Sequence, residues 1–377
     1  VYRTSQLEIP MKILALPNAF KGSLSAASAA LLLQKNLSPR HRVAAFPVSD
    51  GGDGFIDFFK TLYPSAKLRH LTARNAFNRP AKTAYLILPD GKTAILETAR
   101  ICGLGSAKPQ ELDPLNATSY GVGEVLLHAV KHGAKTIYVG LGGVACNDGG
   151  AGAAAACGAQ LLDKQGTPLA LGAQALLKLA QVRVSALKQH FRGIKIYAVA
   201  DVTNPLLGPR SSAKVFGPQK GATPEQVKIL DKALGVYARV LKKATGKDIA
   251  HTPSTAAAGA ICAGLYGCFN ARILLGAEYL FKKAGFEKYA RTADLIITAE
   301  GKLDRQTFGG KAPLAVLKLA KKYQKPVLFI CGVLDETCLR HNPLAPQQIA
   351  VLADFAPTPE QSRAHAAKYL AQLCKSL

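Results

Sequence analysis

Short runs of apolar residues alternate with longer stretches of helical periodicity along most of this chain. The runs, which end in glycine or polar residues, predict buried strands, and the periodic stretches predict helices. We expect strands at 12–16, 42–48, 136–139, 195–199, 294–298 and 326–331. We expect helices at 26–37, 55–62, 117–132, 153–156, 255–267, 314–323 and beyond 358. This alternation predicts an α/β fold.

The pattern changes between residues 68 and 97, where apolar and polar residues alternate with a period of two. Segments 82–88 and 93–97 flank a Pro-Asp-Gly turn, which predicts a β-hairpin and a nearby domain boundary. Because strand–helix alternation returns later, the two ends of the chain are expected to form one doubly wound domain with the middle inserted. We place the first domain at 11–70 and 287–377, and the inserted α/β domain at 71–286.

The stretch 136–158 combines a strand, a glycine-rich loop and an alanine-rich helix. Glycine lets the backbone approach a ligand, and the free N–H groups of a helix start favour an anion. A carboxylate facing phosphate implies an intervening cation, so Asp148 suggests Mg²⁺. The alternative is that Asn147 and Asp148 cap the helix and the glycines form a tight turn. The candidate ligand-binding residues here are Gly142, Gly143, Asn147, Gly149 and Gly150.

The glycine-rich loop fits neither of two known nucleotide-binding motifs in full. The Walker A motif is absent, because no Gly-Lys-Ser/Thr closes the loop. The dinucleotide fingerprint fits Gly140, Gly142 and Ala145 as a string, with Asp163 about 20 residues further on. Asp163 is expected to follow the helix directly rather than to end a second strand. The dehydrogenase interpretation therefore rests on the string alone.

Charged residues also follow other predicted strands, at the sheet edge where ligands of α/β proteins bind. Lys21 suits a phosphate or carboxylate clamp, or is a solvated loop lysine. Asp50 and Gly51 begin an acidic, glycine-rich loop that suits a metal or a hydroxyl group. Asp201 is a candidate base or metal ligand.

Further candidates lie in polar turns. Lys220 stands in a rigid turn between a Gly-Pro pair and a glycine. Arg74 precedes the hairpin and suits a carboxylate, or is a surface arginine. Glu300, Asp304 and Lys311 follow the strand at 294–298.

Composition excludes several classes of protein. The 377 residues suffice for about two domains, and 49% hydrophobic with 19% charged residues is ordinary for a globular enzyme. The chain has no apolar run near the ~20 residues that a membrane span needs. Eight scattered cysteines without a C-x-x-C pair predict reduced thiols and a cytoplasmic location. Residues 1–10 precede the only methionine and are expected to be a leader outside the fold.

The net charge of +24 raises the possibility of a nucleic-acid-associated protein. However, lysine and arginine are spread along the chain, aromatic residues make up 7%, and no basic run occurs. We therefore favour a basic solvated surface and keep nucleic-acid binding as an alternative.

The chemistry of the strand ends narrows the reaction. No histidine or cysteine spacing suggests zinc, and no G-x-S-x-G elbow suggests a serine nucleophile. Positioned lysines with hard carboxylates suit Mg²⁺-dependent phosphoryl transfer, in which positioning and charge neutralisation are central.

Seven sequence blocks extend this interpretation, in the order PNAFKGSLSA, PVSDGGDG, TSYGVGE, GLGGVACNDGGAG, DVTNPLLG, VFGPQKGA and ADLIITAEGKLDRQT, the last followed closely by the GK of Lys311. Together they resemble the signature blocks of the bacterial glycerate kinases, the family that includes the glycerate 2-kinases. The resemblance covers Met11 to about Gly332. It implies transfer of the ATP γ-phosphoryl group to D-glycerate, usually at the 2-hydroxyl, with Mg²⁺. It also implies a flavodoxin-like domain from both chain ends, an inserted domain with a restriction-endonuclease-like core, and an active site between them.

The matching residues are Lys21, Asp50, Asn147, Asp148, Asp201, Lys220, Glu300, Asp304 and Lys311. From this resemblance we infer Asp201 as the base, with Asp148 and Asp304 as Mg²⁺ ligands. Lys21, Lys220 and Lys311 would bind phosphates or the glycerate carboxylate.

Five positions depart from the family blocks: Asn18, Ala19, Val144, Cys146 and Ala299. They bear on nucleotide or substrate contacts in those loops. A kinase of a related hydroxy or sugar acid is the second enzyme hypothesis. The phosphorylated hydroxyl and the oligomeric state stay open.

Overall fold

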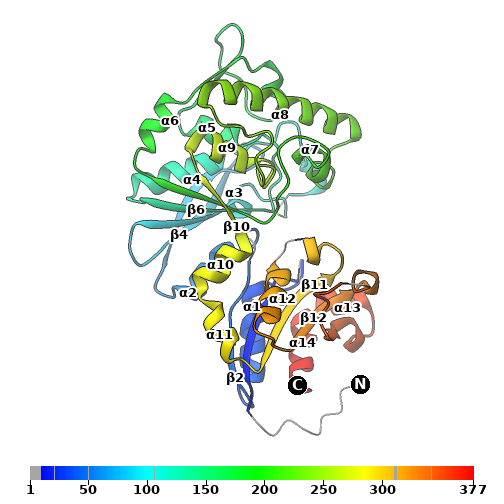
Figure 1. Cartoon of the computed structure of the whole chain (residues 1–377). Coiled ribbons are helices and arrows are strands. Elements are labelled where there is room, and N and C mark those ends of the chain that lie inside the picture. Colours follow the sequence, from blue (N-terminus) through cyan, green and yellow to red (C-terminus); the bar gives the residue numbers. More distant parts are fainter. Residues whose placement is uncertain (1–9, 21, 50, 106, 310–311, 341) are drawn as a thin grey trace. The chain divides into compact units, whose positions relative to one another are not determined.

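The computed structural model describes residues 10–20, 22–49, 51–105, 107–309, 312–340 and 342–377. It is a mixed α/β structure with two compact units (Figure 1). Unit 1 consists of residues 1–50, 57–62 and 276–377, and unit 2 of residues 51–56 and 63–275. Helix α2 (Phe55–Leu62) therefore contributes to both units. The expected leader, Lys21, Asp50 and Lys311 lie outside the described residues.

Unit 1 contains a parallel five-stranded sheet. Its strand order is β13-β12-β11-β1-β2, so the strands at its centre come from opposite ends of the chain. The strands are β1 (Lys12–Pro17), β2 (Arg42–Ala45), β11 (Leu295–Leu303), β12 (Val327–Leu334) and β13 (Gln348–Val351). The helices are α1 (Ala26–Leu37), α10 (Gly276–Ala284), α11 (Phe286–Thr292), α12 (Ala312–Lys322), α13 (Pro359–Ala364) and α14 (Ala366–Lys375). Short 3₁₀ helices are η4 (Thr307–Gly309), η5 (Glu336–Cys338) and η6 (Leu352–Phe355).

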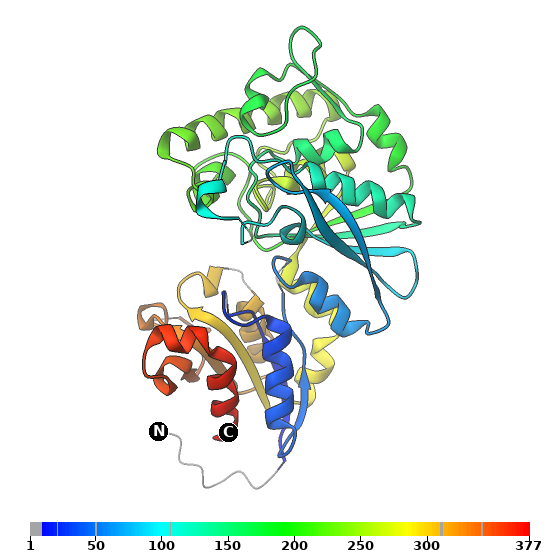
Figure 2. The same cartoon turned by 180° about the vertical axis from the view of Figure 1, so that it is seen from behind.

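Alternating side chains of the central strands form the core on one face of this sheet. Ile13 and Ala15 of β1 pack with Ile297 of β11, and α1 and α14 cover them with Leu33 and Leu370. Figure 2 shows these two helices on the same face of the sheet. Helix α1 begins at the expected residue because Ser25 accepts a hydrogen bond from the Ser28 N–H.

Unit 2 contains a six-stranded sheet of order β10-β9-β6-β5-β4-β3 and a two-stranded sheet, β7-β8. The strands are β3 (Lys67–Arg74), β4 (Pro80–Ile87), β5 (Thr93–Glu97), β6 (Thr136–Leu141), β7 (Gln160–Leu162), β8 (Gln181–Arg183), β9 (Lys195–Ala200) and β10 (Arg272–Leu275). The helices are α3 (Thr98–Cys102), α4 (Tyr120–Lys131), α5 (Ala151–Ala156), α6 (Ser185–His190), α7 (Ser212–Phe216), α8 (Pro224–Thr245) and α9 (Ile261–Phe269). Three 3₁₀ helices are η1 (Pro109–Glu111), η2 (Gln174–Lys178) and η3 (Pro218–Lys220).

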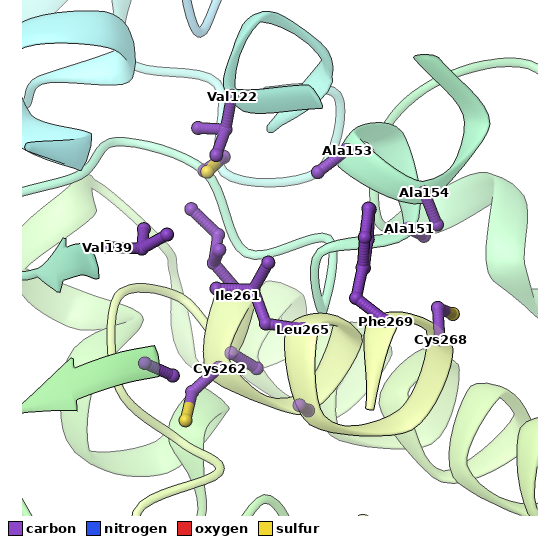
Figure 3. Packing of buried hydrophobic residues seen from close by; sticks show 14 of the residues in the cluster. Val122, Val139, Ala151, Ala153, Ala154, Ile261, Cys262, Leu265, Cys268 and Phe269 are labelled. Carbon is purple, nitrogen blue, oxygen red and sulfur yellow. The ribbon is translucent and has the colours of Figure 1, made fainter. Parts of the chain in front are cut away.

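Strands β5, β6, β9 and β10 of the larger sheet are parallel, and β3 and β4 join β5 in antiparallel pairing. The carboxyl ends of β3, β5, β6, β9 and β10 consequently meet at one edge of this sheet. Small residues of α5 and α9 let these two helices approach closely over the core. Figure 3 shows the Phe269 side chain of α9 extending toward the alanines of α5, with Ile261 and Leu265 in the same cluster.

The expected hairpin is confirmed as β4 and β5, and the helix at 55–62 has the expected bounds. Three expectations were wrong. Strand β11 continues to Leu303 because β12 pairs with it beyond residue 299, so Glu300 lies on a strand. Residues 255–260 are turns, and α9 begins only at Ile261. Asp163 follows β7, and its carboxylate accepts N–H groups of Gln165 and Thr167 in the turn toward β8.

The described unit boundaries differ from the expected domain limits. Strand β3, which a limit at residue 70 would divide, lies wholly in unit 2, and α10 lies in unit 1. All eight cysteines are buried free thiols, and no described helix is long and apolar enough to cross a membrane.

Candidate active site

The candidate site of unit 2 is built on the loop between β6 and α5. Buried β6 delivers residues 142–150 to the carboxyl edge of the sheet, and Asn147 and Asp148 are completely buried there. Asp201 follows β9 at the same edge and is half-buried. The parallel pairing of β6 with β9, rather than their spacing in the sequence, brings these two segments together.

The Asp148 carboxylate is surrounded by hydrogen-bond donors. Its Oδ2 accepts from the Ser119 N–H at 2.8 Å, the Ser119 hydroxyl at 3.0 Å and the Thr118 hydroxyl at 3.1 Å. The N–H groups of Gly150 and Gly152 donate to its Oδ1 and Oδ2, each at 3.2 Å. Asp148 therefore satisfies N–H groups at the start of α5 and ties them to the start of α4.

This arrangement agrees with the helix-capping alternative for Asp148. Burial raises the pKa of this carboxyl group, while the hydrogen bonds from Ser119, Gly150 and Gly152 lower it. Five donors favour the ionised form, because a carboxylate is an acceptor only. A direct role for Asp148 as an Mg²⁺ ligand stays a prediction.

Lys220 and Asn147 form a second buried cluster beside Asp148. The Lys220 Nζ donates to the Cys146 carbonyl at 2.6 Å and to Asn147 Oδ1 at 3.0 Å. Because lysine only donates, this contact orients the amide, whose Nδ2 is buried without a hydrogen-bond partner. Burial lowers the pKa of Lys220 to about 8. The cluster therefore holds an ammonium group and an unpaired amide donor in the buried interior of unit 2.

A strained turn lies against this cluster. Ser254, Ala258 and Ala260 all have positive φ, as does Gly259 at +59°. A Cβ on Gly259 would lie 1.9 Å from the Cys146 carbonyl oxygen and 2.8 Å from Lys220 Nζ. The Gly259 carbonyl also accepts the Gly149 N–H at 3.2 Å. Such strain persists only where the surroundings impose it, so this turn helps to hold Lys220 in place.

The glycines of the loop lie against protein atoms. A Cβ on Gly142 would meet the Cα of Gly52 at 2.6 Å, and one on Gly51 would meet the Val199 carbonyl oxygen at 2.6 Å. Gly143, Gly149 and Gly150 are likewise surrounded, by Asp53, Tyr237 and Ile261 respectively. Close packing of neighbouring segments is thus one reason why glycine stands at these positions.

Arg74, at the end of β3, contributes to the same edge. Its Nε lies 3.6 Å from Glu124 Oε1, its guanidinium donates to Asn78, and it stacks on the Tyr120 ring at 4.5 Å. The side chain keeps 43% exposure, so the guanidinium remains accessible to a carboxylate ligand.

In unit 1 the candidate residues cluster at the end of β11. Glu300 is buried and accepts a short hydrogen bond from the Thr307 hydroxyl, which itself accepts the Asp304 N–H at 3.1 Å. Asp304 accepts the Gln306 N–H at 2.9 Å and lies 3.7 Å from Lys302 Nζ. Thr307 thereby fixes the turn that presents Asp304.

Among the described residues, no group of three His, Cys, Asp or Glu side chains could hold a metal ion. The partly exposed carboxylate of Asp304 fits the way Mg²⁺ is bound in phosphoryl-transfer sites, through one or two carboxylates together with substrate phosphates.

Sequence reasoning missed several residues of these clusters. Thr118 and Ser119 stand in a recognised block, but nothing local indicates that they face Asp148, 29 or 30 residues away. Thr307 and Gly259 were likewise not singled out. Of the departures, Cys146 contributes its backbone carbonyl to Lys220, and Asn18 accepts the N–H of its neighbour Ala19.

Lysines and acids beside glycine-rich strand ends are typical of enzymes that bind phosphorylated ligands. The model of the glycerate kinase family matches residues 13–377. The glycerate 2-kinase of Escherichia coli K12 is 37% identical over 329 residues, covering 86% of each chain. The glycerate kinase of Bacillus subtilis 168 is 34% identical over 373 residues, covering 97% of each. A crystal structure assigned to glycerate kinase 2 of Salmonella typhimurium LT2 superposes with a TM-score of 0.79 at 32% identity, covering 97% of this chain and 96% of that one. The chain therefore belongs to the glycerate kinase family.

Proposed function

We propose that this protein phosphorylates D-glycerate with ATP and Mg²⁺, and that 2-phospho-D-glycerate is the favoured product. The buried contact of Lys220 with Asn147, beside an unpaired Asn147 amide donor, is the observation that supports the site assignment. Two of the three ammonium hydrogens are used by protein acceptors, and the third has no acceptor among the described residues. The names of the relatives support the substrate, and kinase membership supports ATP.

We further propose that unit 1 is a flavodoxin-like doubly wound domain. Numbered within its own sheet, the strand order is 2-1-3-4-5, the order of that fold class. Its ligand edge is where β1 and β11 end, which supports Asp304 as a site residue. Lys21 follows β1 in the sequence and stays a prediction. For unit 2 we retain the proposed restriction-endonuclease-like core. A cytoplasmic location also stays a prediction.

The proposed roles follow from charge and position. Asp201 would accept the proton of the substrate hydroxyl. Lys21, Lys220 and Lys311 would bind phosphates or the carboxylate, with Arg74, Asp50 and Glu300 as further substrate or nucleotide contacts. Asp148 and Asp304 are the proposed Mg²⁺ ligands, and the ion would neutralise charge on the transferred group.

The deciding experiment is ADP release by the full chain with ATP, Mg²⁺ and D-glycerate, with the product identified by ³¹P NMR. Formation of 2-phosphoglycerate supports the proposal. Formation of 3-phosphoglycerate would support kinase activity but contradict phosphorylation at the 2-hydroxyl. Turnover only with tartronate or lactate would contradict glycerate as the substrate. No turnover with any of them, in folded protein, overturns the function.

The site assignment is tested separately by Asn147→Asp. This change keeps an oxygen facing Lys220, replaces the unpaired Nδ2 donor by an acceptor oxygen, and adds a negative charge to the buried cluster. We expect folded protein and a fall in kcat of about 100-fold, the cost of losing one donor to a transition-state oxygen. Unchanged kcat would show that Asn147 does not contact the reacting groups.

A further inference from the structure

A basic cavity lies at the opposite edge of the unit 2 sheet from the candidate active site. Its volume is about 630 Å³, within the range of small-molecule sites. It is bordered by the first residues of β9 and β10, whereas Asn147 and Asp201 lie beyond the carboxyl ends of β6 and β9. Strand β10 pairs with β9 only from Tyr197 onward, and β9 begins at Lys195. Lys195 and Ile196 therefore have no strand beside them on the side of the cavity.

The charges around this cavity are all of one sign. Lys188, Lys195, Lys247 and Arg272 line it together with no acidic residue. None of these four side chains forms an ion pair with a described residue; Lys247 instead lies over the Tyr266 ring at 4.8 Å. Four cations gathered without counter-ions raise the local positive potential and favour an anionic ligand.

A competing explanation is that these four basic residues stabilise the C-terminal ends of helices. Helices α6, α8 and α9 all end at the cavity, and basic residues stabilise helix C-termini. Each helix end carries about half of a negative charge, so three ends supply at most about 1.5. This is less than half of the charge of the four basic side chains. The helix ends therefore balance only part of the positive charge of these four side chains.

The rest of the lining is largely apolar. Phe191 packs edge to face on Phe269 at 5.0 Å, and Tyr197 stacks on Tyr138 at 4.8 Å, which makes a rigid wall. Ile194 is half-buried beside them. An apolar wall with basic groups around it suits a ligand that has a planar or apolar body and at least two negative charges.

We propose that this cavity is a second ligand site, separate from the kinase site, for a small phosphate ester with a planar body, the chemical class of nucleotides. A cavity of about 630 Å³ fits a single small molecule of this kind. The site accounts for part of the +24 net charge, which phosphoryl transfer at the other edge of the sheet does not explain.

The test uses the full chain with D-glycerate and a non-hydrolysable ATP analogue saturating the kinase site. AMP is then added and hydrogen exchange is measured by mass spectrometry. We expect slower exchange in peptides covering 187–197 and 267–272, and none of this protection with adenosine, which lacks the phosphate. Absence of AMP protection there, or equal protection by adenosine, overturns the proposal.

Charge-matched variants locate the binding. Lys195→Glu with Arg272→Glu should weaken AMP binding at least tenfold in calorimetry. Lys228→Glu with Lys232→Glu, two exposed residues of α8 outside the cavity, should change it less than twofold. Equal losses would mean only a general electrostatic effect and would overturn the site. If poly(U) slows hydrogen exchange in these peptides more than AMP does, and AMP does not displace it, the ligand is a nucleic acid and not a small phosphate ester.

Discussion

The Lys220 ammonium donates to Asn147 Oδ1 at 3.0 Å in the buried interior of unit 2. The two residues are 73 positions apart in the chain. Their contact joins the η3 turn to the loop before α5, and it determines which way the amide faces. The charge state of Lys220 should therefore affect both the stability and the activity of the protein.

Lys220 predicts opposite pH dependences for stability and activity. Its folded pKa of about 8 lies below the ordinary lysine value of 10.5, because burial disfavours the ammonium. Between these values the unfolded chain binds a proton that the folded chain lacks, so stability from this site rises with pH. Over that window the unfolding free energy of the wild type should gain about 3 kcal/mol relative to Lys220→Met. Urea unfolding from pH 7 to 10.5 measures this difference.

Activity should change the other way, because the neutral amine would lack the charge with which we propose that Lys220 binds an anion. We expect kcat/KM of the wild type to fall above about pH 8. Cys146 and Asp148 are the titratable groups whose charges act on Lys220 together with Cys102. Lys228→Met, at an exposed lysine of α8, is the control for charge removal. A stability difference independent of pH would contradict the assigned titration.

Asp148→Asn tests the junction of α4 and α5. The amide cannot accept every N–H and O–H group that the carboxylate accepts, so at least one buried donor is left unpaired. We expect a loss of about 3 kcal/mol in the free energy of unfolding. Asp163→Asn, in an exposed turn with two similar N–H contacts, should lose less than about 1 kcal/mol. Equal losses would contradict the junction role.

Gly259→Ala tests the strained turn beside Lys220. The new Cβ would lie 1.9 Å from the Cys146 carbonyl oxygen, so either the turn or the lysine contact must move. We expect more than about 3 kcal/mol of destabilisation, or a folded protein with strongly reduced kcat. Gly246 also has a positive φ, +75°, but a Cβ there would have no atom within 4 Å. Gly246→Ala therefore reports the cost of backbone strain alone, about 1 kcal/mol. Thermal unfolding of both variants separates the two effects.

Asp304→Asn tests the proposed metal ligand of unit 1. Removing the charge should raise the Mg²⁺ concentration for half-maximal activity at least tenfold, with little change in stability, because the side chain is partly exposed. Asp335→Asn is the control, since Asp335 likewise accepts the N–H group of a following turn residue. An unchanged Mg²⁺ requirement, measured by titration after chelator treatment, would exclude direct coordination by Asp304.

The sequence by itself determined the local elements and the family. Ser25 begins α1 through its own neighbours, the period-two pattern gives the hairpin of β4 and β5, and the ordered blocks indicate a glycerate kinase. These features depend on interactions within a few residues, or on a resemblance, and need no knowledge of the packing.

Only the tertiary structure decided which groups meet. The extension of β11 to Leu303 depends on pairing with β12, and the five donors around Asp148 come from two separate segments. The turn at 254–260 reads as helix from its alanines, but its contacts with Cys146 and Asn204 hold it in positive-φ conformations. Parallel pairing of distant strands places these segments at one sheet edge, and local sequence contains no information on that pairing.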